Sequence, residues 1–325
     1  MATATTIRQT LSQNPWVLRA ARWMNNVPHP NLAIEFGMER LTIARWGKPG
    51  TSVNCVVESL PPGALVPSAV ETNIINGEAV AAALGSACKK LSTNDEDVTL
   101  LLPDPVVRVF LQHFEEFPRS AREALPMLRW KLKKSLPFDE SEAVLSFMRQ
   151  TQGGTGCDVA VAIARQRIVR EYEALVESVG LKPGVILSSC LTAVALQEGP
   201  NPTLLARVSD KSLTTAIVCN GVLQVYRCTE LSVHGRELTP QALLEEIFPV
   251  AAYYQDTWHN EIQGVMLAGL GARWREFVGL IESELRCPVR SLLESAVAGG
   301  QIPGEARVLA RQELEGMAGW MLNND

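Results

Sequence analysis

The sequence predicts an α/β fold in which two halves repeat one order of elements. Each half opens with short strands joined by tight turns, and each continues with helices that alternate with buried strands. A further helix and strand interrupt the first half. With 325 residues, of which 46% are hydrophobic, the chain is long enough to bury a core in each half.

The first half opens with a predicted β-hairpin and a third strand. Apolar residues alternate on both sides of a turn at Gly37, at Leu32, Ile34, Phe36, Leu41 and Ile43. Val56 and Val57 indicate the third strand. The alanine-rich stretch 78–91 indicates a closely packed helix, and residues 98–102 a buried strand.

An inserted unit follows, with one helix, a proline stop and one strand. Ser120 and Glu123 fit a capping box, in which a hydroxyl and a carboxylate each accept an N–H group at a helix start. Pro137 ends the helix, and apolar alternation over 143–147 predicts the strand. Because Trp130 stands beside the apolar face of this helix in the sequence, we expect it to anchor the helix to its sheet.

The second half repeats the opening of the first. A strand at 159–164 and a helix with apolar residues from Ile168 to Val179 complete the first half. The second half is predicted to contain strands at 204–208, 213–219 and 222–228, a helix from Thr239, a strand at 264–267 and a helix from Trp274.

These elements divide the chain into four predicted parts. They are an N-terminal extension (1–30), a first core (31–105 and 157–198), an inserted small subdomain (106–156) and a second core (199–325). The second core has a reduced outer subdomain, because Arg236 is followed almost at once by the helix start at Thr239.

Composition excludes several classes of function. A net charge of −5 argues against nucleic-acid binding, which usually needs a basic surface. No run of eighteen or more apolar residues and no apolar signal-peptide core occurs, so we expect a cytoplasmic protein without a membrane span. The seven cysteines form no CxxC pair, and the four histidines have no nucleophile or paired carboxylates around them. We therefore predict no catalytic residues and no metal site.

Several blocks in a fixed order resemble the PilM family of type IV pilus assembly proteins. The pair Arg129-Trp130 is followed after a short spacer by Pro137-Phe138, and three further blocks match, DVAVAIARQRIVREYEALVESVGLKPGVI, EEIFPVAAYYQD and GVMLAGLGARW. The resemblance implies an actin-like (FtsA/PilM-type) duplicated fold. It also implies a cytoplasmic scaffold, peripheral at the inner membrane, that binds a short N-terminal peptide of a PilN-type membrane protein. Contacts with the pilus ATPase ring and self-association are further implied partners.

The resemblance places a nucleotide site between the two halves, where each half of an actin-like ATPase contributes an Asp-x-Gly hairpin. The first hairpin reads Glu35-Phe36-Gly37, which keeps a carboxylate and the glycine, but the second reads Arg207-Val208-Ser209. Asp210 could replace the missing carboxylate only after a register shift. The family's adenosine-side glycine pair appears here as Ala268-Gly269, with Gly271 following. We expect no ATP hydrolysis and at most weak binding of ATP and magnesium.

The resemblance also implies a cleft for the partner peptide beside the inserted subdomain. We expect its walls to include Val107, Val109 and Phe110 on one side and Leu132 and Phe138 on the other. Two alternatives stay open. One is an active actin-like ATPase of the same machinery, and the other is the related cytoplasmic L-type component of a type II secretion system.

Overall fold

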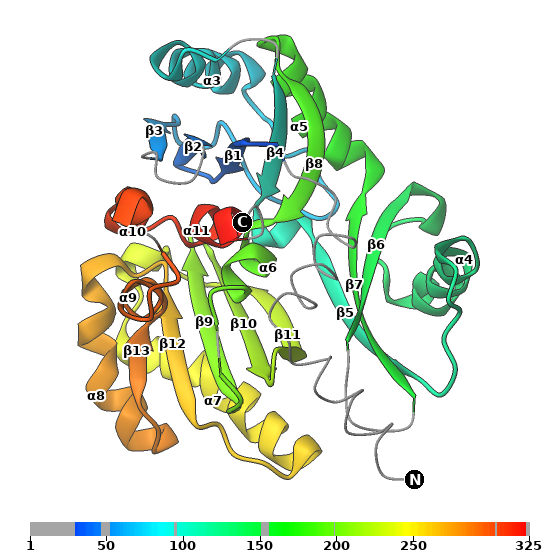
Figure 1. The fold of residues 1–325 in the computed structure, drawn as a ribbon, viewed down its shortest axis with the longest axis vertical. Coiled ribbons are helices and arrows are strands. Elements are labelled where there is room, and N and C mark those ends of the chain that lie inside the picture. The colour runs from blue at the N-terminus through cyan, green and yellow to red at the C-terminus, as the bar shows by residue number, and fades with distance from the viewer. Residues whose placement is uncertain are drawn as a thin grey trace, which may run out of the picture.

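A computed structural model describes residues 30–46, 53–93, 96–150, 156–197, 199–302 and 304–322. Apart from Pro30, the predicted N-terminal extension lies outside these residues. Three sheets and the helices that cover them make up the described part (Figure 1). No helix in the described ranges is long and apolar enough to cross a membrane.

Two five-stranded sheets share one topology. The first has the order β3-β2-β1-β4-β8 and the second the order β11-β10-β9-β12-β13. In each, three antiparallel strands come first and two parallel strands follow. This repeat confirms the predicted actin-like duplication. The strands are β1 (Leu32–Phe36), β2 (Arg40–Arg45), β3 (Asn54–Ser59), β4 (Asp97–Leu102), β8 (Lys182–Ser188), β9 (Thr203–Ser209), β10 (Ser212–Cys219), β11 (Val222–Glu230), β12 (Gly264–Ala268) and β13 (Val289–Ser291).

Helices form three layers around these two sheets (Figure 1). The outer face of the first sheet packs on α3 (Gly77–Leu91) and α5 (Gln166–Ser178), and that of the second on α7 (Pro240–Trp258) and α8 (Trp274–Leu285). The helices between the sheets are α6 (Ser189–Val194), α9 (Leu292–Ala298), α10 (Arg307–Arg311) and α11 (Glu315–Leu322). One shared core therefore joins the two halves.

Local signals explain several helix boundaries. Helix α7 begins as predicted, because the Thr239 hydroxyl accepts the Ala242 N–H and Pro240 needs no N–H partner at the first helical position. It ends where His259 adopts the left-handed conformation. Only residues 231–239, with a single short 3-10 turn, connect β11 to α7, so this part of the second half has no separate outer subdomain.

The inserted subdomain is a three-stranded antiparallel sheet with one covering helix. Its strands are β5 (Arg108–Phe114), β6 (Ala143–Gln150) and β7 (Cys157–Arg165), in the order β5-β7-β6, and its helix is α4 (Ala121–Leu132). The sequence placed the strand from 157 in the first core. Pairing with β5 and β6 puts it in the small sheet instead.

The expectation for Trp130 is wrong. Its side chain is 79% exposed, whereas Leu128 and Leu132 are buried against the small sheet. A helix turns about 100° per residue, so a residue two positions from a buried one points to nearly the opposite side. Trp130 therefore lies on the solvent face of α4.

Candidate functional site

A cleft of about 520 Å³ lies between the two halves, where the resemblance implies a nucleotide site. Five of the six predicted nucleotide-side residues line it, namely Glu35, Gly37, Ser209, Asp210 and Gly269. Gly271 is not among the lining residues. It starts a short 3-10 turn just beyond Gly269, with its Cα beside the Glu313 carboxylate.

Arg207, on β9, places a buried guanidinium inside this cleft. Its Nη1 donates to Asp104 Oδ2 at 2.8 Å, and its Nη2 donates to Ser189 Oγ at 2.9 Å and lies 3.2 Å from Glu35 Oε1. The Ser189 hydroxyl also donates to Glu35. Burial alone would lower the pKa of Arg207, but the Asp104 and Glu35 carboxylates outweigh it and raise that pKa. The side chain therefore stays charged.

Asp104 ties the two halves together beneath Arg207. It follows β4 of the first half, is completely buried, and accepts the Cys190 N–H at 2.9 Å through Oδ1. Its Oδ2 accepts both Arg207 of the second half and the Thr214 hydroxyl of β10, at 2.9 Å. A buried carboxylate is stable only with such partners. The sequence reading missed Asp104, because one Asp in a loop after a buried strand carries no motif.

The turn between β1 and β2 contacts a carboxylate of the second half. The Met38 N–H, directly after Gly37, donates to Asp210 Oδ2 at 2.8 Å. Asp210 reaches this position from the β9–β10 turn, where it adopts a positive φ of 52°. A backbone N–H that could face a phosphate oxygen is therefore already paired with a side-chain anion.

The glycine turn after β12 also has a backbone N–H that donates to a carboxyl group of the chain. The Gly269 N–H donates to Glu315 Oε1 at 2.9 Å. Gly269 has a φ of +73°, and a Cβ there would overlap the Val208 carbonyl, so the turn needs a glycine for its own packing. Burial raises the pKa of Glu315, against the opposing effects of Arg207 and the Gly269 N–H.

Helix α11 fits between the halves because two glycines let it approach closely. A Cβ at Gly316 would overlap Glu35 and Ser189, and one at Gly319 would overlap the Thr192 carbonyl of α6. Trp320 of the same helix is completely buried. The cleft is thus closed from one side by a helix that also supplies Glu315.

Taken together, the polar groups around this cleft are paired with other groups of the same chain. Arg207 contributes a buried guanidinium, while the Asp210 and Glu315 carboxyl groups accept backbone N–H groups of the two turns. A ligand phosphate would have to displace these carboxylates, and a metal ion would meet a buried guanidinium. The geometry favours a closed, self-paired cleft.

Glu39, Asp210 and His234 converge at the cleft mouth, with one ligand atom from each within 4.8 Å of the others. Their hydrogen bonds do not suit a metal ion. The His234 Nδ1 accepts the Arg236 N–H, which leaves its Nε2 to donate to Glu39 at 3.2 Å, and the Arg236 guanidinium lies 2.6 Å from Glu39. These contacts join the halves as surface ion pairs.

The five residues predicted to line the peptide cleft do not face one space. Phe110, Leu132 and Phe138 pack together in the core between α4 and the small sheet, and Leu132 is only 2% exposed. Val109 lies on the other face of the sheet, because successive strand residues point to opposite faces. Val107 is buried in the first-half core. Leu132 and Phe138 therefore cannot form a wall opposite Val109.

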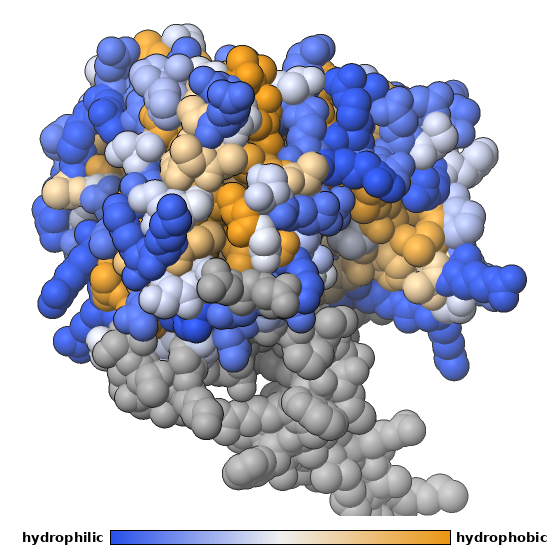
Figure 2. All heavy atoms as spheres, turned by 90° about the horizontal axis from the view of Figure 1, so that it is seen from above, coloured by the Kyte–Doolittle hydropathy of each residue, from blue (hydrophilic) through white to orange (hydrophobic). Residues whose placement is uncertain are grey.

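The face of the small sheet away from α4 carries the apolar surface instead. We call it the free sheet face; it comprises Val109, Leu111, Val144, Met148, Ala160 and Ala162. Ala160 stands between Leu111 and Met148 in the strand register, and alanines leave the middle of the sheet shallow. Met148 is 60% and Val144 43% exposed. Figure 2 shows apolar surface in a hollow on the side of the molecule that carries this subdomain.

The free sheet face had a signal in the sequence that we did not use. Ala143, Leu145 and Phe147 predicted one buried face of β6, yet Val144 and Met148 at the alternate positions are apolar too. A strand that is apolar on both faces usually has two buried faces. Here Val109 and Leu111 at the β5 side of the second face are partly buried against the core between the halves, whereas Val144 and Met148 at the β6 side are exposed.

A groove of about 380 Å³ also separates β5 from β11 of the second half. The Gln150 side chain crosses it, accepting the Leu223 N–H at 2.7 Å and donating to the Leu223 carbonyl at 2.9 Å. Tyr253 and Trp258 of α7 form its far wall, with their rings in an edge-to-face contact. The small subdomain is thereby held against the second half.

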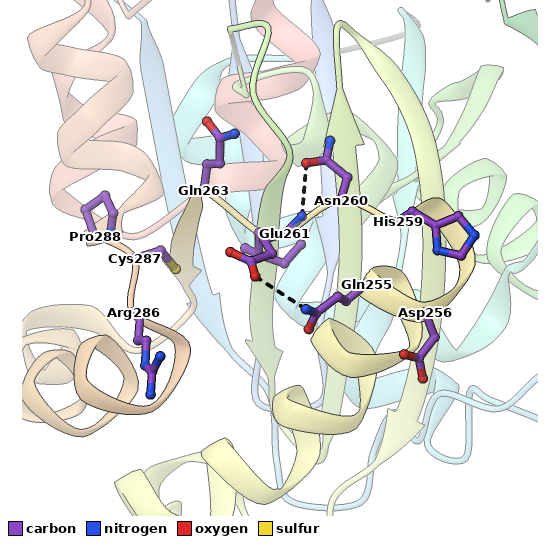
Figure 3. Close-up of a pocket in the computed structure, with 10 residues that line it drawn as sticks. Gln255, Asp256, His259, Asn260, Glu261, Gln263, Arg286, Cys287 and Pro288 are labelled. Atoms are coloured by element: carbon purple, nitrogen blue, oxygen red, sulfur yellow. Dashed lines mark hydrogen bonds between the residues drawn. The ribbon is translucent and has the colours of Figure 1, made fainter.

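A third hollow, about 830 Å³, lies at the far end of the second half (Figure 3). Its lining is polar, and Gln255 donates to Glu261 across it at 3.3 Å. Asp256 lies on α7 and Arg286 directly follows α8, and both side chains point away from the centre in Figure 3. The hollow offers no converging set of groups to a ligand.

Comparisons with solved structures agree with the fold. A chain of a PilM-PilN type IV pilus biogenesis complex covers 92% of this chain and 100% of its own length, with a TM-score of 0.69 and 17% identity. The cytoplasmic domain of EpsL from the Vibrio cholerae type II secretion system has a TM-score of 0.45 and 13% identity, and the match covers 73% of this chain and 80% of that domain. A Bacteroides thetaiotaomicron protein with an actin-like ATPase fold has a TM-score of 0.47 and 10% identity, and the match covers 84% of this chain and 96% of that protein.

No protein-family model matches the sequence, and no curated protein matches it either. At 17% identity, the first structural similarity shows the architecture over almost the whole chain. The chain therefore has the actin-like fold in the form seen in the PilM-PilN complex.

Proposed function

We propose that this protein is a non-hydrolysing scaffold of type IV pilus assembly that binds a cytoplasmic peptide of a PilN-type inner-membrane protein. The observation that carries the proposal is the cleft, where Arg207 pairs with Asp104 and where the Asp210 and Glu315 carboxyl groups accept the backbone N–H groups of the two turns. The similarity to a chain of the PilM-PilN complex supports the partner class. The protein acts in the cytoplasm and reaches the membrane through this partner.

The free sheet face is the surface that suits the peptide. Its exposed residues, Met148 and Val144, stand on β6, an edge strand that pairs only with β7 in the described sheet. An extended peptide can add main-chain hydrogen bonds to such an edge while its side chains occupy the shallow apolar face. The peptide we expect therefore has alternating apolar residues and orders on binding.

The test is a binding assay with a peptide of the first dozen or so residues of a PilN-type protein from the same organism. Met148→Asp should weaken binding about tenfold or more, because a charge on the apolar face costs more than ~1.4 kcal/mol when it is covered. Ile75→Asp is the matched control, since Ile75 is also 60% exposed but lies in the first half. Binding by Met148→Asp that equals wild type would place the peptide elsewhere.

The two alternatives make different predictions in the same experiments. An active ATPase would release phosphate from magnesium ATP in a way that depends on Glu35. An L-type secretion component would leave the pilus peptide unbound while the protein remains folded.

A further inference from the structure

The solvent face of α4 carries an unusual combination of one aromatic and several basic side chains. Trp130 is 79% exposed, the highest value among the large hydrophobic residues in the described ranges. Tryptophan seldom shows this much of its surface to water in a free protein. Lys133 and Lys134 lie three and four positions further on, next to Trp130 on the helix surface. We call Trp130, Lys131, Lys133 and Lys134 the α4 patch.

The three lysines of the α4 patch are exposed, although Lys131 reaches back to β5, where its ammonium donates to the His113 carbonyl at 3.3 Å. The Lys133 side chain is 61% exposed and pairs with Glu140 at 2.8 Å, an exposed contact that a stronger anion can replace. Lys131 places its ammonium 3.9 Å above the Phe114 ring. Glu123, the acidic residue on this side of α4, lies seven positions before Trp130, about 10 Å along the axis. The basic end of the helix thus surrounds the tryptophan.

Charge is unevenly distributed between the small subdomain and the rest of the chain. Residues 106–156 contain eight basic and six acidic side chains. The rest of the chain contains twenty-two basic and twenty-nine acidic side chains. This asymmetry turns the small subdomain toward a negatively charged surface and the two halves away from it. Helix α4 lies at the outer edge of the molecule, so nothing in Figure 1 stands between it and a flat partner.

The shape of the α4 patch distinguishes between two anionic partners. None of the three cavities described above includes Trp130, so the α4 patch offers no pocket to an acidic peptide or a protruding side chain. A convex patch suits a soft, flat surface. Tryptophan prefers the boundary between lipid headgroups and acyl chains, and lysine stems keep their ammonium groups among the headgroups.

We propose that the α4 patch is a peripheral docking site for an anionic phospholipid surface. Trp130 enters the headgroup region, and Lys131, Lys133 and Lys134 contact lipid phosphates. The contact is weak and reversible by itself, because it involves one aromatic residue and three charges. A membrane-anchored partner would bring the α4 patch close to the surface and raise its local concentration. The docking itself needs no partner protein.

The test is flotation of the full chain with vesicles of phosphatidylcholine alone or with about a third phosphatidylglycerol. We expect binding only to the anionic vesicles, and loss of binding when salt shortens the Debye length from about 10 Å to about 3 Å. Lys134→Gln should lower the partition coefficient about fivefold, the factor for ~1 kcal/mol per basic residue near an anionic surface. Trp130→Ala should lower it by at least as much.

Two control variants separate this patch from general surface effects. Tyr253→Ala removes another exposed aromatic residue, on α7, and Lys89→Gln removes a charge on α3; neither should change the partition. Equal binding of wild type to both kinds of vesicle, or unchanged binding of Trp130→Ala and Lys134→Gln, would overturn the proposal. In that case an acidic protein segment becomes the partner to seek.

Discussion

Replacing Arg207 by methionine should destabilise the protein strongly. Methionine keeps much of the side-chain length but removes the hydrogen bonds to Asp104 and Ser189 and the ion pair with Glu35. Asp104 is completely buried, and its remaining partners are the Cys190 N–H and the Thr214 hydroxyl, which are neutral. Removing one partner of a buried ion pair costs about 3 to 5 kcal/mol.

The measurement is urea unfolding followed by far-UV circular dichroism. With a denaturant slope of ~3 kcal/mol/M, the midpoint of Arg207→Met should fall by about 1 M or more. Arg236→Met is the matched control at the same junction, because its pair with Glu39 is exposed at the arginine and should contribute at most ~1 kcal/mol. The double variant Arg207→Met with Asp104→Asn should recover part of the loss. An Arg207→Met midpoint no lower than that of Arg236→Met would refute this reasoning.

Three further predictions follow from burial and packing, all measured as urea midpoints. Trp130→Ala should change the midpoint little, whereas Trp320→Ala, at a completely buried site, should cost about 3 to 5 kcal/mol; equal losses would contradict the assigned faces. Glu315→Gln should become more stable relative to wild type as pH rises above about 4.5. The pKa of Glu315 is raised in the folded state, so its contribution to wild-type stability is complete below the unfolded-state pKa and is lost as pH rises through the folded-state pKa. A constant difference across pH would argue against burial of a carboxyl group there. Gly319→Val should destabilise more than Gly279→Val, since only the former Cβ meets a carbonyl oxygen.

The fold could be predicted because its signals are local and repeated. The alternation at Leu32 to Phe36 and the Asn220-Gly221 turn each identify strands without knowledge of the rest of the chain. The same pattern in both halves gives the duplication. The prediction of α7 from Thr239 succeeded for a related reason, since a capping hydroxyl followed by proline needs no tertiary partner.

The site was less predictable because its contacts join distant segments. Glu35, Gly37, Ser209, Asp210 and Gly269 were placed in one cleft by their hairpins, and the structure brings them together. Asp104 and Glu315 were missed, since each acquires its role only when the halves meet. The error at Trp130 arose from treating neighbours in sequence as neighbours on a helix. The error at Phe110 and Val109 ignored the alternation of a strand.

Nucleotide titration tests the central claim most directly. We propose that the cleft is filled by charges of the chain itself, so isothermal titration of the wild-type protein with ATP and magnesium should give no binding tighter than millimolar. The same titration without magnesium should give the same result, because a metal ion would meet the buried Arg207 guanidinium. A micromolar dissociation constant, lost in Gly37→Val, would show that a nucleotide displaces Asp210 and Glu315 and would contradict the account.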